Sequence, residues 1–223
     1  KGFVEGAVAE QVMAYILYFA RRVDLQSADM HDHCWNSRLM PGAKNHTIGL
    51  VGFGGIGTEV AKRAVPFGMK VIYFCRHPNP ADDAAYGVQS VSMEELLKES
   101  DYVVAAVPLT DQTFHLFNEE RIAQMKAGSV LINIARGPVV DEEALAQALA
   151  SGHLGGCAVD VFPKEPCTNS VLTRYANALL TPHSATSTAE NSKATNFAAA
   201  NNLVNYLKKD IDAKYVVVQG TRY

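Results

Sequence analysis

The sequence predicts an α/β fold with a doubly wound parallel sheet of about seven strands, covered by helices on both faces. Three observations lead to this class. A glycine-rich turn directly follows a short apolar run, a second apolar run comes at the spacing of a βαβ unit, and strand and helix patterns alternate over the rest of the chain. Parallel strands need helical crossovers between them, so this alternation predicts a parallel sheet.

The glycine-rich turn lies in the stretch TIGLVGFGGIGTEVAKRAVPFGMKVIYFCRHP, residues 47–78. Residues 48–51 predict a buried strand, and a helical pattern begins directly behind the glycines. Such a turn lets the backbone approach a pyrophosphate, and the positive end of the following helix faces the phosphates. We therefore expect a Rossmann-type dinucleotide site here, with Gly52, Gly54 and Gly57 as its glycines.

The end of the second apolar run, residues 70–75, indicates which dinucleotide to expect. NAD sites usually carry an acidic residue about 20 residues after the glycines, where it binds the ribose 2′-hydroxyl. Here that position holds Cys75, followed by Arg76 and His77, and no carboxylate lies between positions 68 and 81. A guanidinium can bind a 2′-phosphate, so the sequence favours NADP over NAD. The alternative is that Arg76 is a solvated loop charge.

Composition and charge exclude several kinds of partner. The chain of 223 residues, 48% of them hydrophobic, can bury a sizeable core. Its net charge of −3, without a run of Lys or Arg, gives no indication of a nucleic-acid or membrane partner. The four cysteines, at 34, 75, 157 and 167, form no CxxC pair. We therefore expect reduced thiols, no metal site and a cytoplasmic location.

The first helical pattern covers residues 4–23 and is apolar on two sides, so this helix needs two neighbours. Its interspersed Glu and Gln residues disfavour a transmembrane span or a signal peptide. Because the chain starts abruptly inside this pattern, we expect residues upstream to be missing. Residues 24–46 are polar and predict an arm or linker. Within it, Trp35 is expected to anchor a subunit or domain contact, with a plain surface loop as the alternative.

Strands and helices alternate beyond the glycine-rich unit. Strand patterns fall at residues 89–91, 102–107, 129–134, 156–161 and 178–181, and helical patterns fall at residues 93–99, 119–125, 142–151 and 187–209. The tail, residues 210–223, contains a strand-like VVV. Polar or glycine-rich loops follow four of these strands: VPLTDQT, NIARGPVVDEEAL, DVFPKEP and TPHSATST. Ligands of doubly wound sheets bind at the carboxyl ends of strands, so these loops are expected to line one crevice.

Three residues in these loops could carry chemistry: Arg136, Glu165 and His183. A histidine held by a carboxylate can exchange a proton at neutral pH, because the carboxylate fixes the tautomer and favours the imidazolium. An arginine beside it can bind a carboxylate through two parallel hydrogen bonds. With a nicotinamide, these groups fit hydride transfer to a 2-oxo acid. Taken singly, they have structural alternatives as a capping histidine, a surface glutamate and a structural arginine.

The motifs GFGGIG, VPLTDQT, MKAGSVLINIARGPVVDEEALAQALASGHLGGCAVDVFPKEP and LLTPHSAT together resemble the D-isomer-specific 2-hydroxyacid dehydrogenases. The strand end CysArgHis is similar to that of NADP-using glyoxylate and hydroxypyruvate reductases. The resemblance implies that Arg136 binds the substrate carboxylate, that His183 is the general acid/base and that Glu165 pairs with His183. It further implies that Asp160 holds the nicotinamide amide. The implied cofactor-binding residues are Gly52, Gly54, Gly55, Ile56, Gly57, Cys75, Arg76, His77, Val107, Pro108, Leu109, Thr113, Ala135, Arg136, Asp160, His183 and Ala185.

Members of this family carry a second, flavodoxin-like substrate domain. Nothing in the sequence matches its glycine-bearing loop, so we expect about 100 residues of that domain to be absent. The expected organisation is an inter-domain helix at residues 1–23, a dinucleotide-binding domain at residues 24–186, and a helix and tail at residues 187–223 that return to the incomplete substrate domain. The resemblance also implies a homodimer.

Three functions remain open at this point. The first is an NADP-preferring oxidoreductase acting on a small 2-oxo or 2-hydroxy acid, of which this chain is either the visible portion or a truncated, weakly active form. The second is a non-catalytic, corepressor-like dinucleotide-binding module, and the resemblance does not separate the two, because such corepressors keep the same three residues. The third is a Rossmann reductase acting on a carbonyl compound without a carboxylate.

Overall fold

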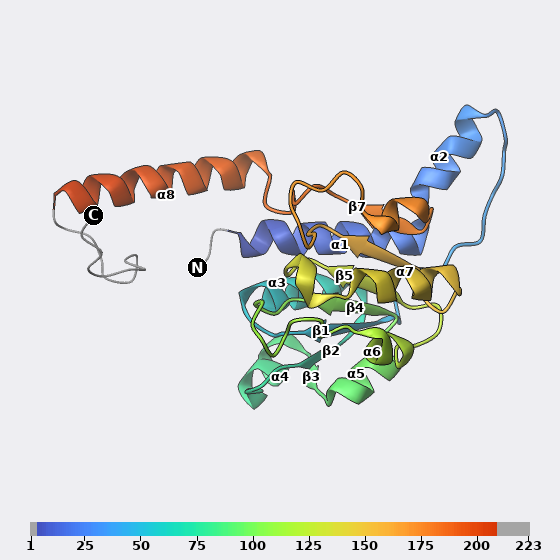
Figure 1. Cartoon of the computed structure of the whole chain (residues 1–223), viewed down its shortest axis with the longest axis horizontal. Helices are drawn as coiled ribbons and strands as arrows, with labels where there is room; N and C mark the ends of the chain where they lie inside the picture. Colours follow the sequence, from blue (N-terminus) through green and yellow to red (C-terminus); the bar gives the residue numbers. More distant parts are fainter. Residues whose placement is uncertain (1–3, 209–223) are drawn as a thin grey trace.

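The computed structural model describes residues 4–208, and a seven-stranded, all-parallel sheet forms its centre (Figure 1). The strand order is β3-β2-β1-β4-β5-β6-β7. The chain moves outward from β1 to β3, returns to β4 beside β1, and then moves the other way to β7, so the topological switch point lies between β1 and β4. The predicted doubly wound sheet of about seven strands is confirmed. The strands are β1 (Thr47–Val51), β2 (Lys70–Phe74), β3 (Gln89–Ser90), β4 (Tyr102–Ala105), β5 (Val130–Asn133), β6 (Gly156–Val159) and β7 (Ala178–Leu180).

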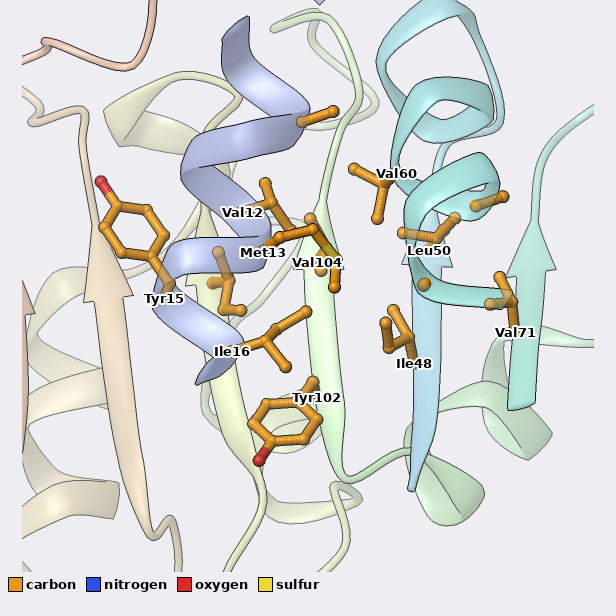
Figure 2. Packing of buried hydrophobic residues seen from close by; sticks show 14 of the residues in the cluster. Val12, Met13, Tyr15, Ile16, Ile48, Leu50, Val60, Val71, Tyr102 and Val104 are labelled. Carbon is orange, nitrogen blue, oxygen red and sulfur yellow. The ribbon is translucent and has the colours of Figure 1, made fainter. Parts of the chain in front are cut away.

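Helices cover both faces of the sheet and bury two separate hydrophobic clusters. Alternate residues of a strand face opposite sides, so Val104 packs in one cluster and Val103 in the other. Helices α1 (Glu5–Arg21) and α3 (Gly55–Ala64) contribute to the first cluster, and α5 (Met93–Glu99), α6 (Glu119–Ala123) and α7 (Glu142–Ala150) contribute to the second. Figure 2 shows Val12, Met13 and Ile16 of α1 lying over the strands of the first face.

Side-chain caps stand at the starts of α5 and α7. Ser92 Oγ accepts the Glu95 N–H at 3.1 Å at the start of α5, in the S-x-x-E arrangement typical of helix N-termini. Asp141 Oδ1 accepts the N–H groups of Glu143 and Ala144 at the start of α7. Each cap fixes the residue at which its helix begins, and therefore also the residue at which the preceding loop ends. The described residues also form three short 3-10 helices: η1 (Val65–Phe67), η2 (Gly137–Val139) and η3 (Val171–Arg174).

The structure corrects the expected linker at residues 24–46. Arg22 adopts a left-handed conformation with φ of 41°, which ends α1, and the chain then forms a second helix, α2 (Val23–His31). Arg22 and Asp24 form an ion pair of 3.0 Å across this turn. The prediction of an arm holds only for the stretch after α2, since polar composition alone does not show that a short helix is present.

A further helix, α4 (Pro80–Tyr86), was not predicted. Asn79 caps it by accepting the Ala81 N–H at 3.2 Å, and proline occupies its first turn. Both residues are helix start signals that are visible in the sequence. They were overlooked because PADDAAY shows only a weak helical periodicity of apolar residues.

Two segments of the described chain project away from the sheet, namely its last helix and the stretch around α2 (Figure 1). Helix α8 (Ala189–Leu207) buries none of its residues and exposes several apolar side chains, among them Phe197 and Tyr206. After α2, Trp35 is 87% exposed. The strand-like VVV of the tail lies outside the described residues. Within residues 4–208, no helix has the length and apolar character needed to cross a membrane.

Helix α1 should belong to the same cooperative core as the sheet. Ile16 is fully buried against β-strand residues, so Ile16→Ala should lower the free energy of unfolding by about 2–5 kcal/mol in a urea titration. Val204→Ala on α8, at a residue 45% exposed, is the control and should change it by less than about 0.5 kcal/mol. Equal effects of the two substitutions would show that α1 does not stabilise the sheet.

Candidate functional site

Three glycines of the turn after β1 have different structural roles. Gly52 has φ of +103°, and a Cβ there would lie 2.4 Å from the Ala106 carbonyl oxygen, so only glycine fits. A Cβ at Gly57 would lie 2.7 Å from the Gly52 carbonyl oxygen, which places the start of α3 against the turn. Gly54 faces open space, with no heavy atom within 4 Å of its Cβ position. This is the cradle that a pyrophosphate requires, namely a tight turn, an accessible backbone and a helix N-terminus.

A cavity of about 420 Å³ opens beside this turn. It lies between the end of β2 and the loop after β4, on the β2 side of the switch point, and its volume is in the usual range for ligand sites. The structure therefore brings Gly52 and Gly54 of the predicted glycine turn together with the CysArgHis strand end. The predicted residues that line it are Gly52, Gly54, Cys75, Arg76, His77, Val107, Pro108 and Thr113.

A second cavity, of about 440 Å³, lies on the other side of the same loop. Ala106, Val107 and Pro108 line both cavities, so the two are neighbours along the carboxyl edge of the sheet. An elongated ligand could place one of its two ends in each cavity and its central part at the glycine turn. The predicted residues that line the second cavity are Ile56, Val107, Pro108, Leu109, Ala135 and Arg136.

Thr113 shapes the loop between the cavities. Its hydroxyl donates to the Pro108 carbonyl oxygen at 2.6 Å and accepts the Thr110 N–H at 2.7 Å. These bonds close the loop on itself, so Thr113 holds the loop besides lining the first cavity. A direct contact of Thr113 with a cofactor stays a prediction.

Arg136 is positioned by a buried amide at the end of β5. The Asn133 side chain, 1% exposed, donates to the Arg136 carbonyl oxygen at 3.1 Å and accepts the Ala135 N–H at 3.1 Å. Arg136 Nη1 in turn donates to the Ala135 carbonyl oxygen at 2.7 Å. A Cβ at Gly137 would lie 2.0 Å from the Phe162 carbonyl carbon, so the loops after β5 and β6 touch at this point. Arg136 therefore stands close to the loop that carries Glu165.

His183 and Glu165 form the predicted pair. His183 Nδ1 lies 2.6 Å from Glu165 Oε2, and Glu165 Oε1 accepts the Phe162 N–H at 2.9 Å. The hydrogen bond from His183, that from Phe162 and the nearby charge of Arg136 lower the pKa of Glu165 below its ordinary value. An ionised carboxylate only accepts, so Nδ1 carries the hydrogen and Nε2 is left to exchange a proton with a ligand.

Asp160, which is 2% exposed, holds the loop that carries His183. Its carboxylate accepts the Thr181 hydroxyl at 2.5 Å, the Ser184 N–H at 2.8 Å and the Ala185 N–H at 3.0 Å. These donors stand on both sides of His183 in sequence. The observed role of Asp160 is thus to order this loop, and its contact with a nicotinamide amide stays a prediction.

Two supporting residues, Asn133 and Thr181, were not among the predicted site residues. A signal exists for each, because a polar residue that ends an otherwise apolar strand is typical of a buried hydrogen-bonding group. All four cysteines are free thiols. Among residues 4–208, no three His, Cys, Asp or Glu side chains are grouped so that they could hold a metal ion.

Fold and site together define a dinucleotide-binding α/β domain, because the open glycine turn lies at the switch point and the hydrogen-bonded His183–Glu165 pair stands at neighbouring strand ends. A sequence profile described as "D-isomer specific 2-hydroxyacid dehydrogenase, NAD binding domain" matches residues 13–185. The chain belongs to the D-isomer-specific 2-hydroxyacid dehydrogenase family.

Named relatives agree with this assignment. The chain is 38% identical over 224 residues to a glyoxylate reductase of Thermococcus litoralis, covering 96% of this chain and 68% of that protein. It is 43% identical over 165 residues to a glyoxylate reductase of Pyrococcus furiosus, covering 74% and 49% respectively. The crystal structure of D-lactate dehydrogenase from Aquifex aeolicus, complexed with NAD and lactic acid, superposes with a TM-score of 0.85 at 30% identity, covering 94% of this chain and 68% of that one. The matched part of the chain thus spans about half to two thirds of the length of these relatives.

Two alanine substitutions test the glycine turn, one through the stability of the fold and the other through cofactor binding. Gly52→Ala should lower the free energy of unfolding by about 2–4 kcal/mol, because φ is positive and the new Cβ meets the Ala106 carbonyl oxygen. Gly54→Ala should leave the fold intact, because its Cβ meets no atom, but should weaken NADPH binding by about 10-fold or more in a fluorescence titration. Unchanged NADPH affinity in Gly54→Ala would mean that no phosphate approaches this turn.

Proposed function

We propose that this chain is the cofactor-binding part of an NAD(P)-dependent oxidoreductase that interconverts a small 2-oxo acid and a D-2-hydroxy acid. The observation that carries the proposal is the His183–Glu165 pair of 2.6 Å in the loops next to Arg136, at the carboxyl edge of the sheet. Two relatives named glyoxylate reductase support glyoxylate as the substrate, and hydroxypyruvate is proposed from the resemblance of the CysArgHis strand end. Arg136 suits a substrate with a carboxylate, which argues against a reductase of neutral carbonyl compounds.

The side chains of this chain would divide the reaction as follows. A bound nicotinamide dinucleotide supplies the hydride chemistry. Arg136 binds the carboxylate of the 2-oxo acid through two hydrogen bonds and so orients its carbonyl group. His183 donates a proton from Nε2 to the carbonyl oxygen, and Glu165 stabilises the imidazolium from which that proton comes. General acid catalysis of this kind contributes about 10²- to 10⁴-fold in rate.

NADP is the proposed preferred cofactor, with NAD as the alternative. The preference is supported by Arg76, which lines the first cavity, and by the lack of a carboxylate at the end of β2. The sites that would hold the dinucleotide are the glycine turn for the pyrophosphate, the first cavity for the adenosine half and the second cavity for the nicotinamide half. A related structure with bound NAD supports a nicotinamide dinucleotide in general.

We further propose the domain boundaries given by the sequence: residues 1–23 as an inter-domain helix, residues 24–186 as the dinucleotide domain, and residues 187–223 as a return to a substrate domain. Helix α8, none of whose residues is buried, supports the last of these, because its exposed apolar side chains need a covering surface. The 87% exposed Trp35 supports a homodimer through the arm.

We also propose a cytoplasmic location and neither nucleic-acid nor membrane partners, in line with the cysteine usage and net charge.

A non-catalytic dinucleotide-binding module, or a weakly active form, is the second candidate. It is favoured by the exposure of the acid/base pair, since the side chains of His183 and Glu165 are 45% and 35% accessible to solvent. Electrostatic and proton-transfer effects are weaker in a site open to water. NADPH binding without turnover of glyoxylate or hydroxypyruvate would support this second candidate.

Replacement of His183 should separate catalysis from cofactor binding. His183→Gln should reduce NADPH oxidation with glyoxylate by about 10²- to 10⁴-fold, because the proton donor is lost, while NADPH affinity stays within about two-fold. His115→Gln is the matched control, since His115 also faces a carboxylate, Asp141 at 3.6 Å, and is 41% exposed. Equal turnover in His183→Gln and the unmodified chain would remove His183 from the mechanism.

Replacement of Arg76 tests the cofactor preference. Arg76→Ala should weaken NADPH binding by about 10- to 100-fold, the effect of losing a hydrogen bond between charged groups, and should leave NADH binding unchanged. Arg174→Ala removes the same charge from η3, outside the linings of both cavities, and should affect neither dinucleotide. Equal losses for NADPH and NADH in Arg76→Ala would show that the arginine does not bind the 2′-phosphate.

A further inference from the structure

A buried tyrosine on the first helix reaches the loop that carries His183. Tyr15, on α1, is 1% exposed, and its hydroxyl lies 2.5 Å from Thr181 Oγ1, although 166 residues separate the two. Thr181 Oγ1 lies in turn 2.5 Å from Asp160 Oδ1. A line of three side chains therefore joins α1 to the carboxylate that orders residues 181–185.

The donor and acceptor of each of these hydrogen bonds follow from the single hydrogen that a hydroxyl group carries. The Thr181 hydroxyl has a single hydrogen, which it donates to the Asp160 carboxylate, so it must accept the hydrogen of the Tyr15 hydroxyl. Burial, and to a smaller degree the charge of Asp160, raises the pKa of Tyr15. Tyr15 thus remains a donor at neutral pH, and its hydrogen bond to Thr181 leaves the Thr181 hydrogen directed at the buried Asp160 carboxylate, which needs donors because it is buried.

The other end of the line fixes the backbone on both sides of His183. Asp160 accepts the N–H groups of Ser184 and Ala185, and the His183 N–H donates to the Thr181 carbonyl oxygen at 3.0 Å. His183 itself has φ of 51°, in the left-handed region that non-glycine residues rarely adopt. Such a conformation persists only where the surroundings determine it, and here those surroundings are the bonds of Thr181 and Asp160.

The part of α1 that carries Tyr15 is held firmly against the sheet. Its neighbours on α1, Val12 and Ile16, are fully buried against the sheet, and Figure 2 shows Tyr15 pointing away from Val60 of α3. The hydroxyl therefore has little freedom to follow a displaced loop.

We propose that Tyr15 and Thr181 are positioning residues for His183, which set the conformation of the loop so that the His183 ring meets Glu165. The catalytic consequence rests on the proposed function, but the position of the ring relative to Glu165 does not. Neither residue would touch a substrate, because both act through Asp160 and the backbone next to His183.

The titration of Glu165 reports the position of the His183 ring without any need for turnover. The hydrogen bond from His183 is the main cause of the lowered pKa of Glu165. Tyr15→Phe removes one oxygen and keeps the ring, so the carboxyl carbon of Glu165, followed by NMR in the full chain, should titrate at a pH higher by about 0.5 or more. An unchanged Glu165 titration in a folded Tyr15→Phe protein would overturn the proposal.

Two variants at Thr181 give an independent comparison if Tyr15→Phe does not fold. Thr181→Val removes the hydroxyl at nearly constant shape and should raise the Glu165 pKa, whereas Thr181→Ser keeps the hydroxyl and should restore the unmodified titration. Tyr102→Phe, at a tyrosine 5% exposed in the same core cluster, controls for the loss of a buried phenol and should leave Glu165 unchanged. Identical titrations of the Val and Ser variants would contradict the role of the Thr181 hydroxyl.

Turnover distinguishes this proposal from the proposed function. If the unmodified chain reduces glyoxylate, Tyr15→Phe and Thr181→Val should lower kcat by about 5- to 10-fold and leave the KM for NADPH unchanged. If the unmodified chain binds NADPH without turnover, the second candidate function is supported instead, and the Glu165 titration still decides whether Tyr15 positions His183.

Discussion

The close approach of Gly52 to the Ala106 carbonyl group is the constraint on which the crevice depends. Ala106 N–H donates to the Val51 carbonyl oxygen at 2.8 Å, so β1 and β4 end at the same level, and the chain can turn only where no side chain stands between them. That turn leaves Gly54 open and starts α3 beside it. The two cavities then lie on either side of the loop after β4. A side chain at residue 52 would therefore block the turn that lies between the two cavities.

Buried polar side chains at the ends of β5 and β6 order the second half of the site. Asn133 and Asp160 are nearly inaccessible to water, and burying such groups is unfavourable unless they are hydrogen-bonded. Each meets this requirement with groups of the neighbouring loop, next to Arg136 in one case and next to His183 in the other. The same bonds that compensate for burial therefore hold the two chemically important loops in place.

The sheet and the glycine turn could be predicted because their signals are local: apolar runs, glycines and their spacing. The His183–Glu165 pair could be predicted because both residues follow strands of one sheet, and the family resemblance named their roles. The short helices α2 and α4 were missed because weak periodicity outweighed their start signals. The contact of Tyr15 with Thr181 could not be predicted, since only the packing of α1 on the sheet brings residues 166 positions apart together.

A crystal structure of the chain with NADPH is the most direct test of whether the switch-point crevice is a dinucleotide site. We expect the pyrophosphate on the backbone of residues 54–56, the 2′-phosphate at Arg76, and the nicotinamide beside Ala135 on the side of His183. NADPH bound elsewhere on the molecule, or no NADPH at saturating concentration in a folded protein, would contradict the assignment of the crevice.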